Sequence, residues 1–235
     1  MSLNETVQEI LNRIKNDEII EHIGVNSNKI VLLNNDIQLK KIIQSADIIN
    51  ADGISVVKAV RFLKGIKIER VTGIDTMNEL IKHAEKENIS VYFLGSKPEV
   101  LEKMVAKIHQ GYPKLNILGY HHGYFNNERE VVDRIKNVRP DMLFVGITSP
   151  YKEYFIHKYK YELNAKLLMG VGGSFDVLSG NLKRAPKWMQ LAGLEWFFRF
   201  IQEPKRLFKR YCIENIIFLK IIFRERLESS RNKSR

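Results

Sequence analysis

Short apolar runs alternate with amphipathic stretches along most of this chain. The runs lie at 22–26, 46–50, 90–95, 116–120, 141–147 and 165–173, and helical periodicity appears at 27–45, 54–64, 75–87, 97–110, 127–137, 150–161 and 174–179. Apolar strands separated by helices of about ten residues are typical of a mostly parallel sheet with helices on both faces. The pattern therefore predicts a Rossmann-like α/β domain.

The positive charge is concentrated in the last quarter of the chain. Residues 181–235 hold 14 Lys+Arg against 5 Asp+Glu, a balance of +9 out of the total +11, and they include both tryptophans. We therefore divide the chain into an α/β domain at 1–180 and a basic, helical C-terminal appendage at 181–235. Such an asymmetry indicates an anionic partner, either phospholipid or nucleic acid.

Two features favour a cytoplasmic location. The single cysteine, Cys212, has no partner for an internal disulfide, which suits a reducing compartment. The first residues, MSLNETVQEI, carry early acidic side chains and helical periodicity, which resembles neither a signal peptide nor a transit peptide.

Polar and glycine residues gather where the predicted strands end. Ligands bind at the carboxyl ends of strands in such sheets, where helix N-termini present their N–H groups. The preferences of turns and helix caps explain each residue taken alone. Because all of them fall at the carboxyl ends of predicted strands, together they predict one crevice. The set comprises Asn26, Asn50, Asp52, Gly53, Thr72, Gly73, Asp75, Gly95, Ser96, Gly123, Tyr124, Gly146–Pro150 and Gly170–Asp176.

Several kinds of site are disfavoured by the motifs. There is no G-x-x-x-x-G-K-[ST] sequence, and GVGGSF carries Phe175 where a dinucleotide fingerprint has its third glycine. The histidines form no H-E-x-x-H or Cys/His cluster, and the adjacent His121 and His122 fit a turn better than a shared ion. We expect neither a metal nor a cofactor, so that backbone amides and arginines meet any phosphate.

Asp52 has two interpretations from the residues alone. It follows a buried strand and precedes a helix, so its carboxylate suits an N-cap that contributes roughly 1 kcal/mol. A carboxylate at the floor of a crevice also suits a general base for a hydroxyl nucleophile. The sequence alone does not decide between these two roles of Asp52.

The tail also has more than one interpretation. Pro204 should end a helix formed by MQLAGLEWFFRFIQE, and the apolar run at 216–223 is far shorter than the roughly 20 residues of a membrane span. Its apolar residues, among them Phe197, Phe198 and Phe218, suit a core or oligomer contact as well as lipid. A basic, aromatic tail also suits nucleic acid, although here the charge lies on helices rich in Phe and Ile.

Five segments in this order and spacing carry a resemblance: NADGISVVKAVRFLKG…ERVTGID, VYFLGSKPEV, GYHHGYF, FVGITSPYKE and MGVGGSFDVLSGNLKRAPKWMQLAGLEWFFRFIQEPKRLFKRY. From about residue 20 to residue 212 the chain resembles bacterial glycosyltransferase family 26, of the N-acetylmannosaminyltransferase type. These enzymes act in wall teichoic acid, enterobacterial common antigen and capsule assembly. The final segment is the most specific part of the match.

The resemblance implies an inverting, metal-independent transfer of a sugar from a UDP donor to a sugar on undecaprenyl diphosphate. It implies Asp52 as catalytic base and Gly172, Gly173 and Asp176 as nucleotide contacts. It also implies a basic tail docked on the inner face of the plasma membrane, and no nucleic acid as partner. Relatives suggest that the chain self-associates, and a monomer bound to the membrane is the alternative. The candidates for the diphosphate or the membrane are Arg184, Arg199, Arg206 and Arg210.

The chain departs from the family pattern at two places. Relatives usually have Thr-x-Asn at the first strand end, where this chain has Gly24-Val25-Asn26. Relatives usually have Pro-x-Gln-Glu, where this chain has Pro150-Tyr151-Lys152-Glu153. Lys152 has either a donor phosphate or Glu153 as its expected partner. The donor sugar is therefore left open between N-acetylmannosamine, the family default, and another such as glucose.

Overall fold

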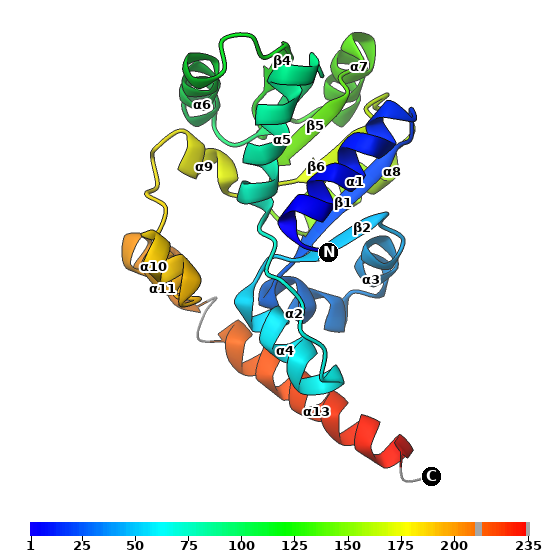
Figure 1. Cartoon of the computed structure of the whole chain (residues 1–235), viewed down its shortest axis with the longest axis vertical. Coiled ribbons are helices and arrows are strands. Elements are labelled where there is room, and N and C mark those ends of the chain that lie inside the picture. The colour runs from blue at the N-terminus through cyan, green and yellow to red at the C-terminus, as the bar shows by residue number, and fades with distance from the viewer. Residues whose placement is uncertain (210–212, 234–235) are drawn as a thin grey trace.

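The fold is built on one six-stranded sheet whose strands all run parallel (Figure 1). The computed structural model describes residues 1–209 and 213–233, without the side chains of residues 206, 209, 230, 232 and 233. The spatial order of the strands is β2-β1-β6-β5-β3-β4. Their bounds are β1 Ile20–Val25, β2 Ile48–Ala51, β3 Val91–Gly95, β4 Ile117–His121, β5 Met142–Gly146 and β6 Leu167–Gly170. The predicted Rossmann-like α/β class is confirmed.

Helices bury both faces of the sheet, because alternate strand residues point to opposite sides. On one face Phe93, Phe144 and Met169 pack with α1 (Leu3–Lys15), α5 (Gly73–Glu87), α6 (Pro98–Gly111) and α9 (Ser174–Leu178). On the other face Leu94, Val145 and Leu168 pack with α7 (Glu128–Val138) and α8 (Tyr151–Tyr159). Apolar residues of β1 meet α2 (Ser27–Asn35) and α3 (Ile37–Gln44).

The predicted helix at 27–45 is two helices, which meet at Asp36. This residue has an extended backbone, with φ −131° and ψ 92°, and its carboxylate accepts the N–H of Leu39 at 2.9 Å as the N-cap of α3. An aspartate that caps a helix in this way competes with continuation of the helix before it. The hydrophobic periodicity on either side was read correctly, but the break between the two segments was missed.

The described part of the tail contains the helices α10 (Lys187–Leu191), α11 (Glu195–Gln202), α12 (Pro204–Lys209) and α13 (Asn215–Lys233). The single helix expected over 189–203 breaks at Gly193, which has φ +73°, a backbone conformation that favours glycine. The end of α11 before Pro204 is confirmed, with this proline starting α12.

Helix α13 lies along α2 and α4 (Ile54–Lys64) and extends away from the sheet (Figure 1). Phe218 anchors it, since this side chain is only 5% exposed and packs with Val31 and Ala59. Phe218 is therefore a packing residue, while Phe197 is 42% exposed. The division of the chain at residue 180 stays a prediction.

Among the described residues, no helix combines the length and the apolar character that crossing a bilayer requires.

Candidate functional site

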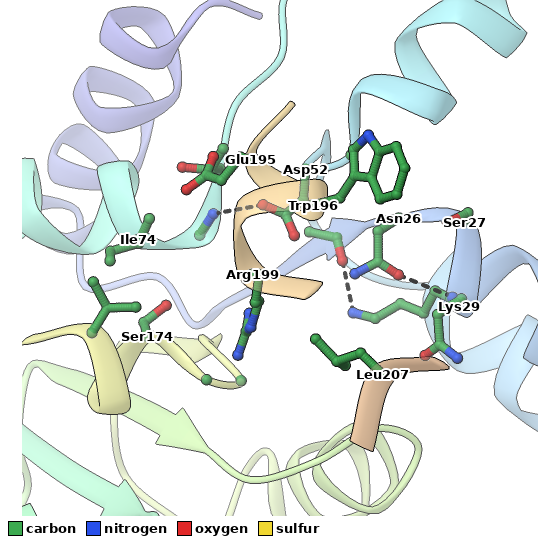
Figure 2. A pocket seen from close by; sticks show the side chains of 18 of the residues that line it. Asn26, Ser27, Lys29, Asp52, Ile74, Ser174, Glu195, Trp196, Arg199 and Leu207 are labelled. Atoms are coloured by element: carbon green, nitrogen blue, oxygen red, sulfur yellow. Dashed lines mark hydrogen bonds between the residues drawn. The ribbon is translucent and has the colours of Figure 1, made fainter. Parts of the chain in front are cut away.

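A cleft of about 1400 Å³ opens at the carboxyl ends of the strands, between the sheet and the tail helices (Figure 2). Asp52, Lys29 and Arg199 surround this opening although they come from three distant segments of the chain. The predicted residues that line it are Asn26, Asp52, Gly53, Thr72, Gly73, Ser96, Tyr124, Gly146, Lys152, Gly172, Gly173, Asp176, Arg184 and Arg199. The single crevice expected from the strand ends is therefore present.

Asp52 is held at the cleft floor by backbone contacts. Its N–H donates to the carbonyl of Val25 at 2.9 Å, which continues the pairing of β2 with β1. Its carboxylate oxygen Oδ1 accepts the N–H of Gly73, the first residue of α5, at 3.1 Å. Helix α4, which follows Asp52, has Gly53 as its N-cap residue and no side-chain cap hydrogen bond. The capping interpretation thus fails for α4, and the carboxylate instead faces the N-terminus of α5.

A buried group of three charges lies beside this floor. Lys29 donates from Nζ to Glu153 Oε1 at 2.8 Å and to the carbonyl of Gly24 at 2.7 Å. Lys152 Nζ lies 2.7 Å from the same carboxylate oxygen and also contacts the hydroxyl of Ser149. All three charged side chains are at most 6% exposed. The expected pairing of Lys152 with Glu153 is therefore present.

The shared carboxylate responds to both ammonium groups. Burial by itself raises the pKa of Glu153, but Lys29 and Lys152 outweigh it and lower the pKa to about 2. Burial, reinforced by Lys29, lowers the pKa of Lys152 to about 8, although Glu153 and Asp52 oppose this change. The negative charge of Asp52 therefore favours the protonated form of Lys152.

Both departures from the family pattern lie in the cleft. Gly24 and Lys152 both contribute to its lining. A side-chain carbon at position 24 would lie 3.2 Å from Cβ of Asp52, so glycine leaves Asp52 more room there. Asn26, the residue of the first motif that is retained, caps α2 by accepting the N–H of Lys29 at 3.1 Å.

A chain of ion pairs ties the tail to the α/β domain. Arg184 binds the carboxylate of Asp75 with two bonds of 2.7 Å, and its Nε lies 3.4 Å from Glu195 Oε1. The other oxygen of Glu195 accepts Arg70 NH2 at 2.5 Å. Arg70 Nε in turn donates to the main-chain carbonyl of Asp52 at 3.0 Å. The tail helix α11 is therefore connected to the loop that carries Asp52.

Arg199 projects from α11 over the glycine-rich loop after β6. A side-chain carbon at Gly173 would lie 2.3 Å from Arg199 NH2, so the absence of a side chain lets the guanidinium approach the loop backbone. Among the described residues its buried Nε has no hydrogen-bond acceptor, and a carboxylate oxygen of Glu203 lies 3.8 Å from it. A guanidinium above a loop of backbone N–H groups is suited to a diphosphate.

Some predicted residues lie outside the cleft lining. Asn50 is buried among Thr6 and His22, bonded to Thr6 Oγ1 at 3.2 Å and His22 Nε2 at 2.8 Å. Asp75 and Glu153 support the site through ion pairs rather than by facing the opening. Gly95 packs against the backbone of Gly146, from which an added side-chain carbon would lie only 2.5 Å away.

Three further predicted residues remain, and two of them fall wholly or partly outside what the structure describes. Pro150 also lies outside the lining; it follows a cis peptide bond and precedes α8. The side chain of Arg206 lies outside the described part of the chain, and so does Arg210 as a whole.

Sequence reasoning missed Lys29, Arg70 and Glu195. Lys29 and Glu195 look like ordinary helix-surface residues in the sequence, and their role depends on partners more than 100 residues away. Arg70 sits in the RVTGID stretch that carried part of the family resemblance, and this was the one available signal. Within the described ranges, 1–209 and 213–233, no group of three or more His, Cys, Asp and Glu is placed to hold a metal ion.

Comparisons with known proteins identify the family to which this chain belongs. The family model described as the glycosyl transferase WecG/TagA/CpsF family matches residues 1–232. Two similar proteins are both named N-acetylglucosaminyldiphosphoundecaprenol N-acetyl-beta-D-mannosaminyltransferase. The protein from Bacillus subtilis (strain 168) is 39% identical and that from Bacillus spizizenii 37% identical, each over 165 residues. The match covers 70% of this chain and 64% of each relative, so the chain spans less than two thirds of their length.

The buried charge group leads to a prediction on stability. Glu153→Gln leaves Lys29 and Lys152 buried without a counter-charge, and breaking a buried pair in this way lowers the free energy of unfolding by about 3–5 kcal/mol. Urea denaturation followed by circular dichroism at pH 7 measures the change. The control is Glu130→Gln, which removes an exposed pair with Arg134 and changes stability by less than about 1 kcal/mol. Equal losses in the two variants would contradict the prediction.

The same carboxylate predicts a pH dependence. Because the pKa of Glu153 falls from 4.5 to about 2 on folding, its stabilising contribution is complete above pH 4.5 and disappears as the pH falls through about 2. The difference in stability between the native chain and Glu153→Gln should therefore shrink over this window. A difference that stays constant from pH 6 to pH 2 would show that the carboxylate is not held ionised by the two lysines.

Proposed function

The chain belongs to the glycosyl transferase WecG/TagA/CpsF family, and from this premise we propose that it transfers a sugar from a UDP-sugar to a polyprenyl-diphosphate-linked sugar acceptor. The observation that carries the proposal is the placement of Asp52 and Arg199 on one cleft at the carboxyl edge of the sheet. The carboxylate suits the reacting hydroxyl, and the guanidinium suits the leaving diphosphate.

Asp52 acts as general base in this proposal. The acceptor hydroxyl attacks the anomeric carbon and passes its proton to the carboxylate, while the bond from that carbon to the diphosphate oxygen breaks. Inversion at the carbon follows because nucleophile and leaving group lie on opposite sides. The bond from Gly73 N–H to Oδ1 fixes the carboxylate in place. Such a base typically contributes about 10² to 10⁴ in rate.

The leaving UDP carries the charge that develops as the bond breaks. Arg199 above Gly173 and the backbone N–H groups of Gly172 and Gly173 provide positive charge at that position before the reaction begins. Fixed donors of this kind lower the barrier because they need no reorganisation during the reaction. In this proposal the protein neutralises the diphosphate without a metal ion. Asp176 completes this wall of the cleft.

The donor sugar is either N-acetylmannosamine or a related hexose such as glucose. The names of the two relatives specify an N-acetyl-mannosaminyl group and an N-acetylglucosaminyl-diphosphoundecaprenol acceptor. Gly24 and Lys152 lie at the floor beside Asp52, where the donor sugar would sit, so these two departures from the family pattern are the positions where a different sugar would be selected. The lipid acceptor is independent of that choice.

A lipid-linked acceptor requires access to a membrane surface. The tail exposes large apolar side chains, including Trp188 at 64% and Leu191 at 89%, alongside its basic residues. Aromatic residues suit the headgroup zone, and each basic residue near an anionic leaflet contributes about 1 kcal/mol. We therefore place the enzyme peripherally on the inner face of the bacterial plasma membrane, as part of cell-surface polysaccharide or teichoic acid assembly.

Loss of the proposed base gives the most direct test of the chemistry. With UDP-N-acetylmannosamine or UDP-glucose and a lipid-diphosphate-linked acceptor, the native chain should form a disaccharide that mass spectrometry identifies. Asp52→Asn should lower turnover at least about 10²-fold while UDP binding and the fold are kept. The control is Asp17→Asn, a side chain 84% exposed and remote from the cleft. Near-normal turnover of Asp52→Asn would remove Asp52 from the base role.

Membrane binding can be tested separately by flotation with anionic vesicles. Trp188→Ser combined with Leu191→Ser should weaken binding by about 10-fold or more, since each large apolar side chain removed from lipid costs about 1.5–3 kcal/mol. Tyr161→Ser, which removes a side chain 77% exposed on the α/β domain, should leave binding unchanged. Higher salt should weaken binding further. Flotation that is insensitive to both the double substitution and salt would refute binding of the tail to the membrane through these side chains.

A further inference from the structure

The cleft has an apolar continuation that the transfer chemistry does not use. The cavity that contains Asp52 extends between α4, α11 and α13, and we name this part the apolar arm. The apolar residues that line it come from all three helices and from α12: Ile54, Ala59, Phe62, Phe198, Leu207, Phe218, Leu219, Ile222 and Phe223. Several are open to solvent, with Phe62 at 46%, Leu219 at 53% and Phe223 at 58% exposed.

The walls of the apolar arm are fixed by packing. Phe62 of α4 meets Phe223 of α13 edge to face, with ring centroids 5.9 Å apart. The guanidinium of Arg226 lies 5.4 Å from the centre of the Phe62 ring and donates to the carbonyl of Leu63 at 3.3 Å. Together with the buried Phe218, these contacts hold α13 against α4 along the course seen in Figure 1. The exposed rings therefore belong to a formed groove.

The cavity is polar at one end and apolar at the other. Asp52, Lys152 and Arg199 lie at the polar end, while Lys58 lines the cavity from the same helix as Phe62. A ligand that fills both ends must join an anionic, sugar-bearing head to an extended hydrocarbon chain. Residues 215–223 cover roughly 13 Å along the axis of α13, enough for the first few isoprene units. The remainder of a long chain would stay in the bilayer.

We propose that the apolar arm binds the first isoprene units of the acceptor's polyprenyl chain and thereby sets the direction from which the acceptor hydroxyl reaches Asp52. The inference rests on the proposed function, because the acceptor is the ligand with this head and chain. Continuity of the groove with the cleft favours this occupant over a flat bilayer surface or a second copy of the chain. Apolar burial in the arm would add to binding in proportion to the chain length inside it.

The experiment compares acceptors that share the sugar diphosphate and differ in lipid length, from a methyl group through one to several isoprene units, in solution without vesicles. The native chain should show kcat/KM rising over the first few units and then reaching a plateau. In Leu219→Ser with Phe223→Ser, KM for the prenylated acceptors should rise at least about 10-fold, since apolar burial is lost. KM for the UDP-sugar and turnover of the methyl acceptor should stay unchanged.

The matched control is Leu227→Ser, which alters a 65% exposed residue of the same helix beyond the arm lining and should leave every KM unchanged. If the native chain used prenylated and methyl acceptors equally, binding of isoprene units in the apolar arm would be refuted, while the proposed sugar transfer would stand. No product with any acceptor would instead count against the function itself. An effect of the double variant on vesicle flotation alone would assign these residues to the bilayer, and its effect on a concentration-dependent dimer would assign them to a second copy.

Discussion

The parallel direction of all six strands is the constraint from which the site follows. It brings every strand's carboxyl end to one edge, so Asp52 after β2, the 172–174 loop after β6 and Asn26 after β1 open onto one cleft. Asp52 is then fixed by main-chain groups, with its N–H on Val25 and its carboxylate on the N–H of Gly73. Its position therefore depends on sheet pairing and the start of α5 rather than on flexible side chains.

The side of the cleft formed by the tail helices is held by ion pairs between the tail and the α/β domain. Arg184 with Asp75 and Arg70 with Glu195 bring together residues 109 and 125 positions apart in the sequence. These pairs are part-buried, so they are better held than surface ion pairs. They place Arg199 over the glycine loop and leave the apolar side chains of α11 and α13 around the mouth of the cleft. The tail thus completes the site.

The strands and most helices could be predicted because apolar periodicity reports directly on burial in a parallel sheet. The misreadings have local physical causes: Asp36 caps α3 and splits one predicted helix, and Gly193 splits another by its left-handed backbone. Asn50 follows the exposed Ile49, so strand alternation turns its amide inward toward α1 and away from the ligand edge. Partners such as Lys29 with Glu153 could not be found, since their pairing exists only after folding.

The central claim is that Asp52 and the diphosphate of the donor share one cleft. A crystal structure of the chain with UDP tests this most directly. The account predicts the diphosphate between Arg199 and the backbone of Gly173, with space for a sugar ring between it and the Asp52 carboxylate. Uridine diphosphate bound elsewhere, with Asp52 out of reach of a sugar attached to it, would contradict the account.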